Sequence, residues 1–229
     1  MKDYWEDRFL TEGKIWGDLP SKTALYARDL FKNHQVQNIL VPGAGYGRNA
    51  EYFEAEGFKV TGIEISETAL KTARQKNQKI IYYQGSVLEM PFSEIFYDAI
   101  YCFNVLHLFR ESNRRIFVEK CLNQIKENGF VFFTVFSEQE SSFGKGTSVE
   151  INTYESKPGR PVHYFTESDL KEHFKGFEVI EHGLMEDPEN HGSEGPHTHL
   201  VRYIFAQRKM AFEFDGNKYK STSKHQKEW

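Results

Sequence analysis

Ile39-Leu-Val-Pro-Gly43-Ala-Gly45-Tyr-Gly47-Arg-Asn-Ala50 is the stretch that decides the fold of this chain of 229 residues. Its apolar start, bounded by turn residues, is typical of a strand in a parallel sheet. The glycines have no Cβ, so they permit a tight turn and a close approach of the backbone to a ligand. A helix follows, and its free N–H groups and positive dipole end point at whatever lies above the loop.

A second predicted strand, residues 58–63, ends beside an acidic residue, Glu64, which lies 21 positions after Gly43. A carboxylate at this point is placed to bind the two hydroxyls of a ribose. The dinucleotide fingerprint has a third glycine at its sixth position, but here that position is Arg48. The pattern therefore favours a nucleoside without a pyrophosphate, and a tight turn without any ligand is the structural alternative.

Together with later segments, this pattern resembles motif I of the class I S-adenosylmethionine (SAM) dependent methyltransferases. The later segments are Tyr97-Asp98, Asn104-Val-Leu-His107 and Ile125-Lys-Glu-Asn-Gly-Phe130. The resemblance covers roughly residues 10–206 and is strongest to small-molecule enzymes of the tellurite-resistance and thiopurine types. It implies SAM as the cofactor and transfer of its methyl group to a small-molecule acceptor by in-line displacement.

Strands and helices alternate through the fifth strand, which predicts an α/β fold with a doubly wound, Rossmann-like sheet and helices on both faces. The sixth and seventh strands, near residues 177–182 and 198–206, follow each other without a helix and should pair antiparallel. This agrees with the seven-stranded order 3-2-1-4-5-7-6 of the resembled fold, in which strand 7 is antiparallel. Residues 137–165, and 186–197 before the seventh strand, are predicted to be loops; in the family the first helps form the acceptor pocket.

We predict one domain over residues 1–229, with a helical lid segment (1–35), a SAM-binding core (36–206) and a C-terminal extension (207–229). Within the extension, residues 212–219 suggest a hairpin with an Asp-Gly turn. No apolar run reaches membrane-spanning length, which predicts a soluble cytoplasmic protein. The net charge of −4 argues against nucleic acid as a partner, and the sequence leaves open whether the chain is a monomer or a homodimer.

The resemblance assigns cofactor-binding roles by position. The glycines approach the methionine end of SAM, Arg48 or Asn49 meets its carboxylate, and Glu64 holds the ribose. Ser86 stands where the family usually has an acidic residue that binds adenine, and Trp16 is a candidate lid whose ring would favour a sulfonium cation. The full predicted set is Trp16, Gly43, Ala44, Gly45, Gly47, Arg48, Asn49, Glu64, Ile65, Ser86, Val87, Leu88, Asn104, Val105 and Leu106.

Three histidines, His107, His163 and His199, are the predicted catalytic residues, because they stand near the expected acceptor side and imidazole can orient or deprotonate an acceptor. His197 and His199 flank one residue on an extended segment, so their rings point the same way, as two metal ligands would need. No spacing among the histidines is diagnostic of a metal site, and we predict none.

Other functions remain open at this stage. An NAD(P)-dependent oxidoreductase would show the missing third glycine, whereas a SAM-binding module without catalysis would share the same cofactor half. Methylation of nucleic-acid amines usually requires an Asn- or Asp-Pro-Pro-Tyr motif, and Asn104-Val-Leu-His107 departs from it.

Overall fold

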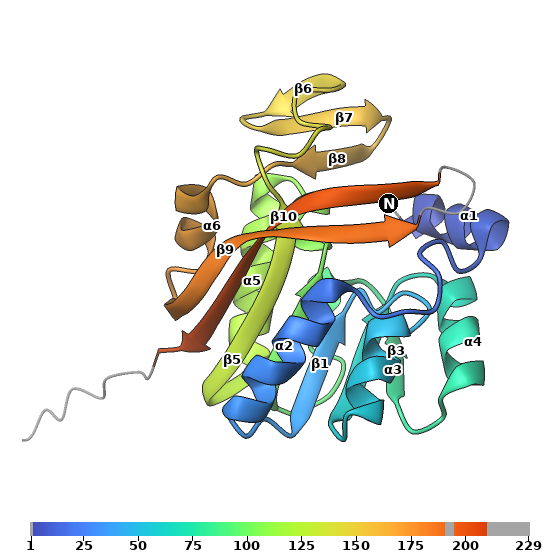
Figure 1. The fold of residues 1–229 in the computed structure, drawn as a ribbon, viewed down its shortest axis with the longest axis vertical. Coiled ribbons are helices and arrows are strands. Elements are labelled where there is room, and N and C mark those ends of the chain that lie inside the picture. Colours follow the sequence, from blue (N-terminus) through green and yellow to red (C-terminus); the bar gives the residue numbers. More distant parts are fainter. Residues whose placement is uncertain (1, 191–194, 210–229) are drawn as a thin grey trace, which may run out of the picture.

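A seven-stranded sheet in the order β3-β2-β1-β4-β5-β10-β9 is the centre of the computed structural model (Figure 1), which describes residues 2–190 and 195–209. The strands β3 to β5 in this order run parallel, and β10 runs antiparallel to both of its neighbours. The predicted doubly wound fold and its strand order are confirmed. The strands are β1 (Asn38–Pro42), β2 (Lys59–Glu64), β3 (Ile81–Gln84), β4 (Tyr97–Phe103), β5 (Ile125–Phe136), β9 (Phe177–Asn190) and β10 (Pro196–Arg208).

Helices cover both faces of the sheet, and several begin at polar residues that cap them. The hydroxyls of Ser21, Ser66 and Thr166 each accept a hydrogen bond from the backbone N–H three residues later, which satisfies one free donor of the helix start. The helices are α1 (Lys2–Glu12), α2 (Lys22–Asn33), α3 (Arg48–Ala55), α4 (Glu67–Lys76), α5 (Glu111–Gln124) and α6 (Glu167–His173), with short 3₁₀ turns η1 (Val87–Glu89) and η2 (Leu106–Leu108).

The core has two layers because successive residues of a strand point to opposite faces of the sheet. Ile39 and Val41 of β1 pack with Phe31 of α2 and Phe53 of α3 on one face. Leu40, between them, belongs to the cluster that α5 and α6 form on the other face. Each central strand is therefore buried on both sides, which explains its continuous apolar sequence.

Residues 137–165 contain a second sheet, so the prediction of an irregular loop there is wrong. Turns at Asn152 and Gly159, both with positive φ, reverse the chain between its antiparallel strands. Their polar sequence concealed them, since an antiparallel sheet can present one face to water. Figure 1 shows this small sheet standing above one end of the main sheet. Its strands are β6 (Thr147–Glu150), β7 (Thr153–Lys157) and β8 (Arg160–His163).

The hairpin of β9 and β10 is longer than predicted. Residues 186–190 and 196–197, which the prediction placed in a loop, continue the two strands, and Asn190 pairs with Pro196. Pro188 is compatible with strand structure because β9 is an edge strand of the sheet. Glu189, His197 and His199 are consequently held in a regular hairpin.

The N-terminal helix α1 lies near the tips of β9 and β10 in Figure 1. The Glu6 carboxylate accepts hydrogen bonds from the Ser66 hydroxyl at 2.7 Å and the Thr68 N–H at 3.3 Å, at the positive end of α4. Within the described ranges, no helix is long and apolar enough to span a membrane. The predicted hairpin at 212–219 lies outside the described residues.

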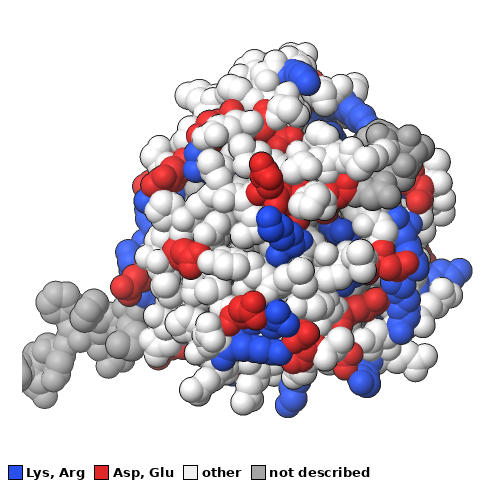
Figure 2. Space-filling model, viewed as in Figure 1, with Lys and Arg blue, Asp and Glu red and all other residues white. Residues whose placement is uncertain are grey.

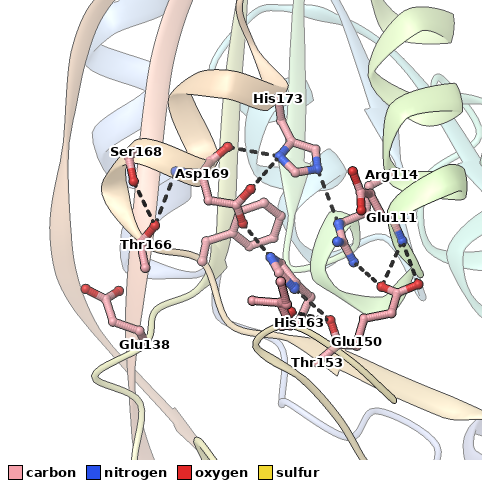
Figure 3. A network of polar contacts seen from close by, with 12 residues as sticks. Glu111, Arg114, Glu138, Glu150, Thr153, His163, Thr166, Ser168, Asp169 and His173 are labelled. Carbon is pink, nitrogen blue, oxygen red and sulfur yellow. Dashed lines mark hydrogen bonds and ion pairs between the residues drawn. The ribbon is translucent and has the colours of Figure 1, made fainter. Parts of the chain in front are cut away.

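A polar network joins the small sheet to α5 and α6 (Figure 3). His163 Nε2 lies 2.5 Å from the Asp169 carboxylate, and its Nδ1 lies 2.8 Å from Thr153 Oγ1. His173 Nδ1 contacts the backbone oxygen of Asp169 at 2.9 Å, and Arg114 Nε donates to His173 Nε2 at 3.3 Å. Burial acts to raise the pKa of Asp169, but the hydrogen bonds from His163 and His173 outweigh it and lower that pKa below its usual value.

The substitution Asp169→Asn should lower the free energy of unfolding by about 1–3 kcal/mol, because it removes the charged partner of buried polar groups. Urea denaturation at pH 7 measures this difference. Since the folded pKa is lowered, the contribution is present above the unfolded pKa and should decline as the pH falls below about 4. Asp29→Asn, on a carboxylate that is 64% exposed, is the matched control and should change stability by less than about 0.5 kcal/mol. Equal effects of the two variants would contradict the assignment.

Candidate active site

A cavity of about 720 Å³ opens at the carboxyl ends of the parallel strands. Ligands bind at this edge of open α/β sheets, beside the point where the strand order reverses. Here that point lies between β1 and β4. Most residues of the predicted cofactor set line the cavity, namely Trp16, Gly43, Ala44, Gly45, Arg48, Asn49, Glu64, Ile65, Ser86, Val87, Leu88, Asn104 and Val105.

Gly43 lets two loops meet at the reversal point. Its φ is +69°, and an added Cβ would lie 2.3 Å from Cγ2 of Val105, so a larger residue would push the loops apart. Gly47 has a φ of +93°, and a Cβ there would lie 2.7 Å from the Tyr82 hydroxyl. Gly47 belongs to the glycine loop but does not line the cavity. Leu106 is buried in the core and does not line the cavity either.

Glu64 ends β2 with its carboxylate fixed against the glycine loop. Oε2 accepts a hydrogen bond from the Gly45 N–H at 2.8 Å, and Oε1 accepts from the N–H groups of Ile65 and Ser66, both at 2.9 Å. Burial raises the pKa of this carboxyl, and the three N–H donors act in the opposite direction. The carboxylate is thus held in the cavity wall at the position expected for a ribose-binding acid.

Aromatic side chains form a wall beside the glycine loop. The rings of Trp16 and Tyr46 are stacked with centroids 6.2 Å apart, and the backbone N–H of Trp16 donates to the Tyr46 hydroxyl at 3.0 Å. Trp5 and Phe9 of α1 pack in the same cluster. The candidate lid residue Trp16 therefore lies in the cavity wall with α1 against it.

Arg48 and Asn49 reach the cavity but already have partners in the protein. The Arg48 guanidinium forms an ion pair with Glu189 and donates to the carbonyl oxygen of Trp16 at 3.2 Å. Asn49 Oδ1 accepts a hydrogen bond from the Ser21 N–H at 2.9 Å. These contacts tie α3 to the lid segment, to β9 and to the start of α2.

Ser86 and Asn104 border the cavity from the ends of β3 and β4. The Ser86 hydroxyl accepts a hydrogen bond from the Leu88 N–H at 3.2 Å and caps η1. Asn104 has a φ of +54°, and its Oδ1 accepts a hydrogen bond from the Thr134 hydroxyl at 3.0 Å. Both side chains are therefore oriented by their neighbours.

Two of the predicted catalytic histidines, His107 and His199, line one part of the cavity. We call this part the acceptor half, and its wall is formed by His107, Leu108, Phe136, Lys145, Lys157, Arg160, Val162 and His199. Phe136 stacks on both histidines, with ring centroids 4.2 Å from His107 and 4.7 Å from His199. His107 is 2% exposed, and its Nδ1 has no hydrogen-bond partner among the residues described. Burial lowers the pKa of His107 well below its usual value, and the positive charge of Arg160 adds to this, so its ring is neutral at pH 7.

The structure does not bring His163 into the cavity wall. Figure 3 shows its ring between Thr153 and Asp169, in the network that holds the small sheet. Its position indicates a structural role, and only His107 and His199 of the three predicted histidines are brought together at the site.

Comparisons with known proteins agree with this geometry. A family model described as a methyltransferase domain matches residues 40–133. The ubiquinone biosynthesis O-methyltransferase of Rickettsia akari is 30% identical over 131 residues, which are 56% of this chain and 49% of that protein. A SAM-dependent methyltransferase from Methanosarcina mazei has a TM-score of 0.68 at 17% identity, over 80% of this chain and 98% of that chain. A 1,6-didemethyltoxoflavin-N1-methyltransferase from Burkholderia thailandensis, solved with S-adenosylhomocysteine, has a TM-score of 0.66 at 18% identity, over 91% of this chain and 87% of that chain.

Residues 40–133 therefore match a methyltransferase domain, and the chain has the fold of solved SAM-dependent methyltransferases. It spans about half the length of the curated relatives that it matches. At identities below 20%, the two solved structures establish the shared fold alone.

The cavity has the features that SAM requires. Gly43 and Gly45 line the cavity and have no side chain, so the backbone of the loop itself forms this part of the wall. Glu64 presents a fixed carboxylate beside them. Trp16 lies in the same wall, and the guanidinium groups of Arg8 and Arg48 lie 5.7 Å and 5.8 Å from the centroid of its ring. The residues present therefore fit the cofactor of the family.

Several charged residues of the cavity wall were not singled out by the sequence analysis. Those on the small sheet were missed because its strands were taken for a loop, although Pro158-Gly159 between two short polar runs is a turn signal. Glu140 and Glu189 were missed because their partners are distant in sequence. The missed charged residues of the wall are Arg8, Glu140, Lys145, Lys157, Arg160 and Glu189.

Calorimetric titration should show that the wild type binds S-adenosylhomocysteine and not NAD. Glu64→Ala should weaken this binding about 10- to 100-fold, the loss expected for a hydrogen bond to a charged group of about 1.5–3 kcal/mol. Glu119→Ala, on an exposed part of α5, is the control and should bind as the wild type does. Equal affinity in the Glu64 variant, with its fold verified by circular dichroism, would remove Glu64 from the cofactor site.

Proposed function

We propose that this chain transfers the methyl group of SAM to a proton-bearing oxygen or ring nitrogen of a small, acidic acceptor. The observation that carries this proposal is the acceptor half of the cavity, whose wall includes His107, a buried histidine whose Nδ1 has no hydrogen-bond partner among the residues described. The residues that we assign to the acceptor half are His107, Leu108, Phe136, Lys145, Lys157, Arg160, Val162 and His199.

The size and surroundings of the cavity support a small molecule as the acceptor. A volume of about 720 Å³ lies within the range of roughly 300–1,000 Å³ that is usual for small-molecule sites. The face in Figure 2 shows basic and acidic side chains interspersed, and the sequence has a net charge of −4. A protein that binds nucleic acid typically gathers its basic residues into a patch or stripe.

Three cations support an acidic acceptor. Lys145, Lys157 and Arg160 reach the acceptor half from the region of the small sheet. Arg160 donates to the Tyr4 hydroxyl at 3.2 Å, while its Nε is buried without a hydrogen-bond partner in the described part of the chain. A carboxylate or phosphate on the acceptor would gain charge-assisted hydrogen bonds here.

His107 supports an acceptor atom that must lose a proton. SAM supplies an electrophilic methyl group, so an acceptor that gains it must give up its proton to a base. His107 is neutral, and the ring nitrogen that carries no proton can accept the proton of the acceptor. The walls of the cavity align the acceptor and exclude water. The relatives named above, an O-methyltransferase and an N1-methyltransferase, act on these two kinds of atom according to their names.

The proposal is tested with labelled SAM and a panel of phenols and ring N–H heterocycles, each with and without a carboxylate. We expect S-adenosylhomocysteine to form, with kcat/KM at least about tenfold higher for the acidic member of a pair, as expected for one hydrogen bond to a charged group. Thiols complete the panel. Binding of S-adenosylhomocysteine without methyl transfer to any member would instead support a non-catalytic SAM-binding module.

His107→Gln should lower kcat about 10²- to 10⁴-fold on the best acceptor, because glutamine cannot take up the proton. The affinity for S-adenosylhomocysteine should stay unchanged, which separates loss of the base from misfolding. His182→Gln, outside the cavity wall, is the control. Because the base acts in its neutral form and its pKa is lowered, His107 should cause no loss of wild-type rate between pH 8 and pH 6. An unchanged kcat in His107→Gln would exclude this role.

A further inference from the structure

Three side chains with metal-binding atoms converge in the wall of the cavity. Glu140 comes from the segment between β5 and β6, and His197 and His199 come from β10. One donor atom from each lies within 4.8 Å of the other two. The two histidines stand two residues apart on one strand, so their side chains share a face of the hairpin.

The distances suit a single bound ion. Oε1 of Glu140 lies 3.2 Å from Nδ1 of His199 and 3.5 Å from Nε2 of His197. Ligands placed about 2.0–2.2 Å from a zinc ion in tetrahedral geometry lie roughly 3.3–3.6 Å from one another. An ion bound by all three side chains also needs the two imidazoles close together, and one nitrogen of each lies within 4.8 Å of the other. The same spacing also suits a hydrogen-bonded group without an ion, and the experiment below distinguishes the two.

The surrounding residues hold the carboxylate and one imidazole in place. Glu140 has a side chain that is 2% exposed, and its other oxygen accepts a hydrogen bond from the Leu200 N–H at 2.6 Å. The ring of His199 is stacked on Phe136. Such supporting contacts orient metal ligands in proteins. The His197 side chain is 44% exposed, which gives an ion access from solvent.

We propose that Glu140, His197 and His199 bind one divalent transition-metal ion at the acceptor end of the cavity. Two imidazoles and one carboxylate suit Zn²⁺ or Co²⁺ better than Mg²⁺, which prefers oxygen ligands. Three protein ligands leave one tetrahedral position for a ligand, and all three residues line the cavity. A carboxylate or hydroxyl oxygen of a bound small molecule can fill that position.

The test uses protein without a histidine tag, freed of metal by chelation and titrated with zinc chloride in a calorimeter. We expect saturable binding of one ion per chain, and no comparable binding of Mg²⁺. Glu140→Gln, His197→Ala and His199→Ala should each weaken zinc binding by more than about tenfold, since loss even of an outer residue that supports a ligand costs this much. Co²⁺ should give visible absorption bands in the wild type that these variants lose.

Glu140→Gln is the decisive variant, because its amide oxygen can still accept the hydrogen bond from Leu200 while the charge is lost. His182→Ala, outside the cavity wall, should bind zinc as the wild type does. Absence of one-to-one binding in the wild type, or unchanged binding in Glu140→Gln and His199→Ala, would overturn the proposal. Titration of the same metal-free protein with S-adenosylhomocysteine tests the cofactor site separately, so failure of one proposal is distinguishable from failure of the other.

Discussion

The close approach of Gly43 to Val105 is the constraint on which the rest of the site depends. These residues follow β1 and β4, the two strands between which the order of the sheet reverses. Because Gly43 has no Cβ and a positive φ, the loops meet without a clash, and the cavity opens beside them. The Glu64 carboxylate then fixes the next part of the loop through the Gly45 N–H. The backbone geometry of these loops thus determines the shape of the cofactor side of the cavity.

Segments outside the five parallel strands enclose the acceptor side. The polar network around Asp169 attaches the small sheet to α5 and α6, and the ion pair of Arg48 with Glu189 attaches the long hairpin to α3. The small sheet supplies Lys157 and Arg160, whereas β10 supplies His199 and the η2 turn supplies His107. The acceptor half therefore depends on contacts between residues far apart in the sequence.

Most residues of the predicted cofactor set line the cavity, because the sequence signals behind them act over short distances. The glycine loop, the caps Ser21 and Ser66, and the acid at Glu64 each depend on neighbours within a few residues or on one strand. Arg48 shows the limit of prediction from local sequence. Its position in the loop suggested a ligand carboxylate, but Glu189, 141 residues away, occupies its guanidinium.

Hydrophobic periodicity and glycine spacing are local properties of the sequence. For this reason the doubly wound sheet, its antiparallel final strand and the position of the glycine loop could be predicted without the structure. The tertiary structure alone decided which histidines share a cavity. His163 contacts Asp169 and does not line the cavity. Glu140, from the segment between β5 and β6, lies beside His197 and His199 of β10. Such groups of side chains form only when strands pair and loops pack, so the spacing of residues within one segment does not predict them.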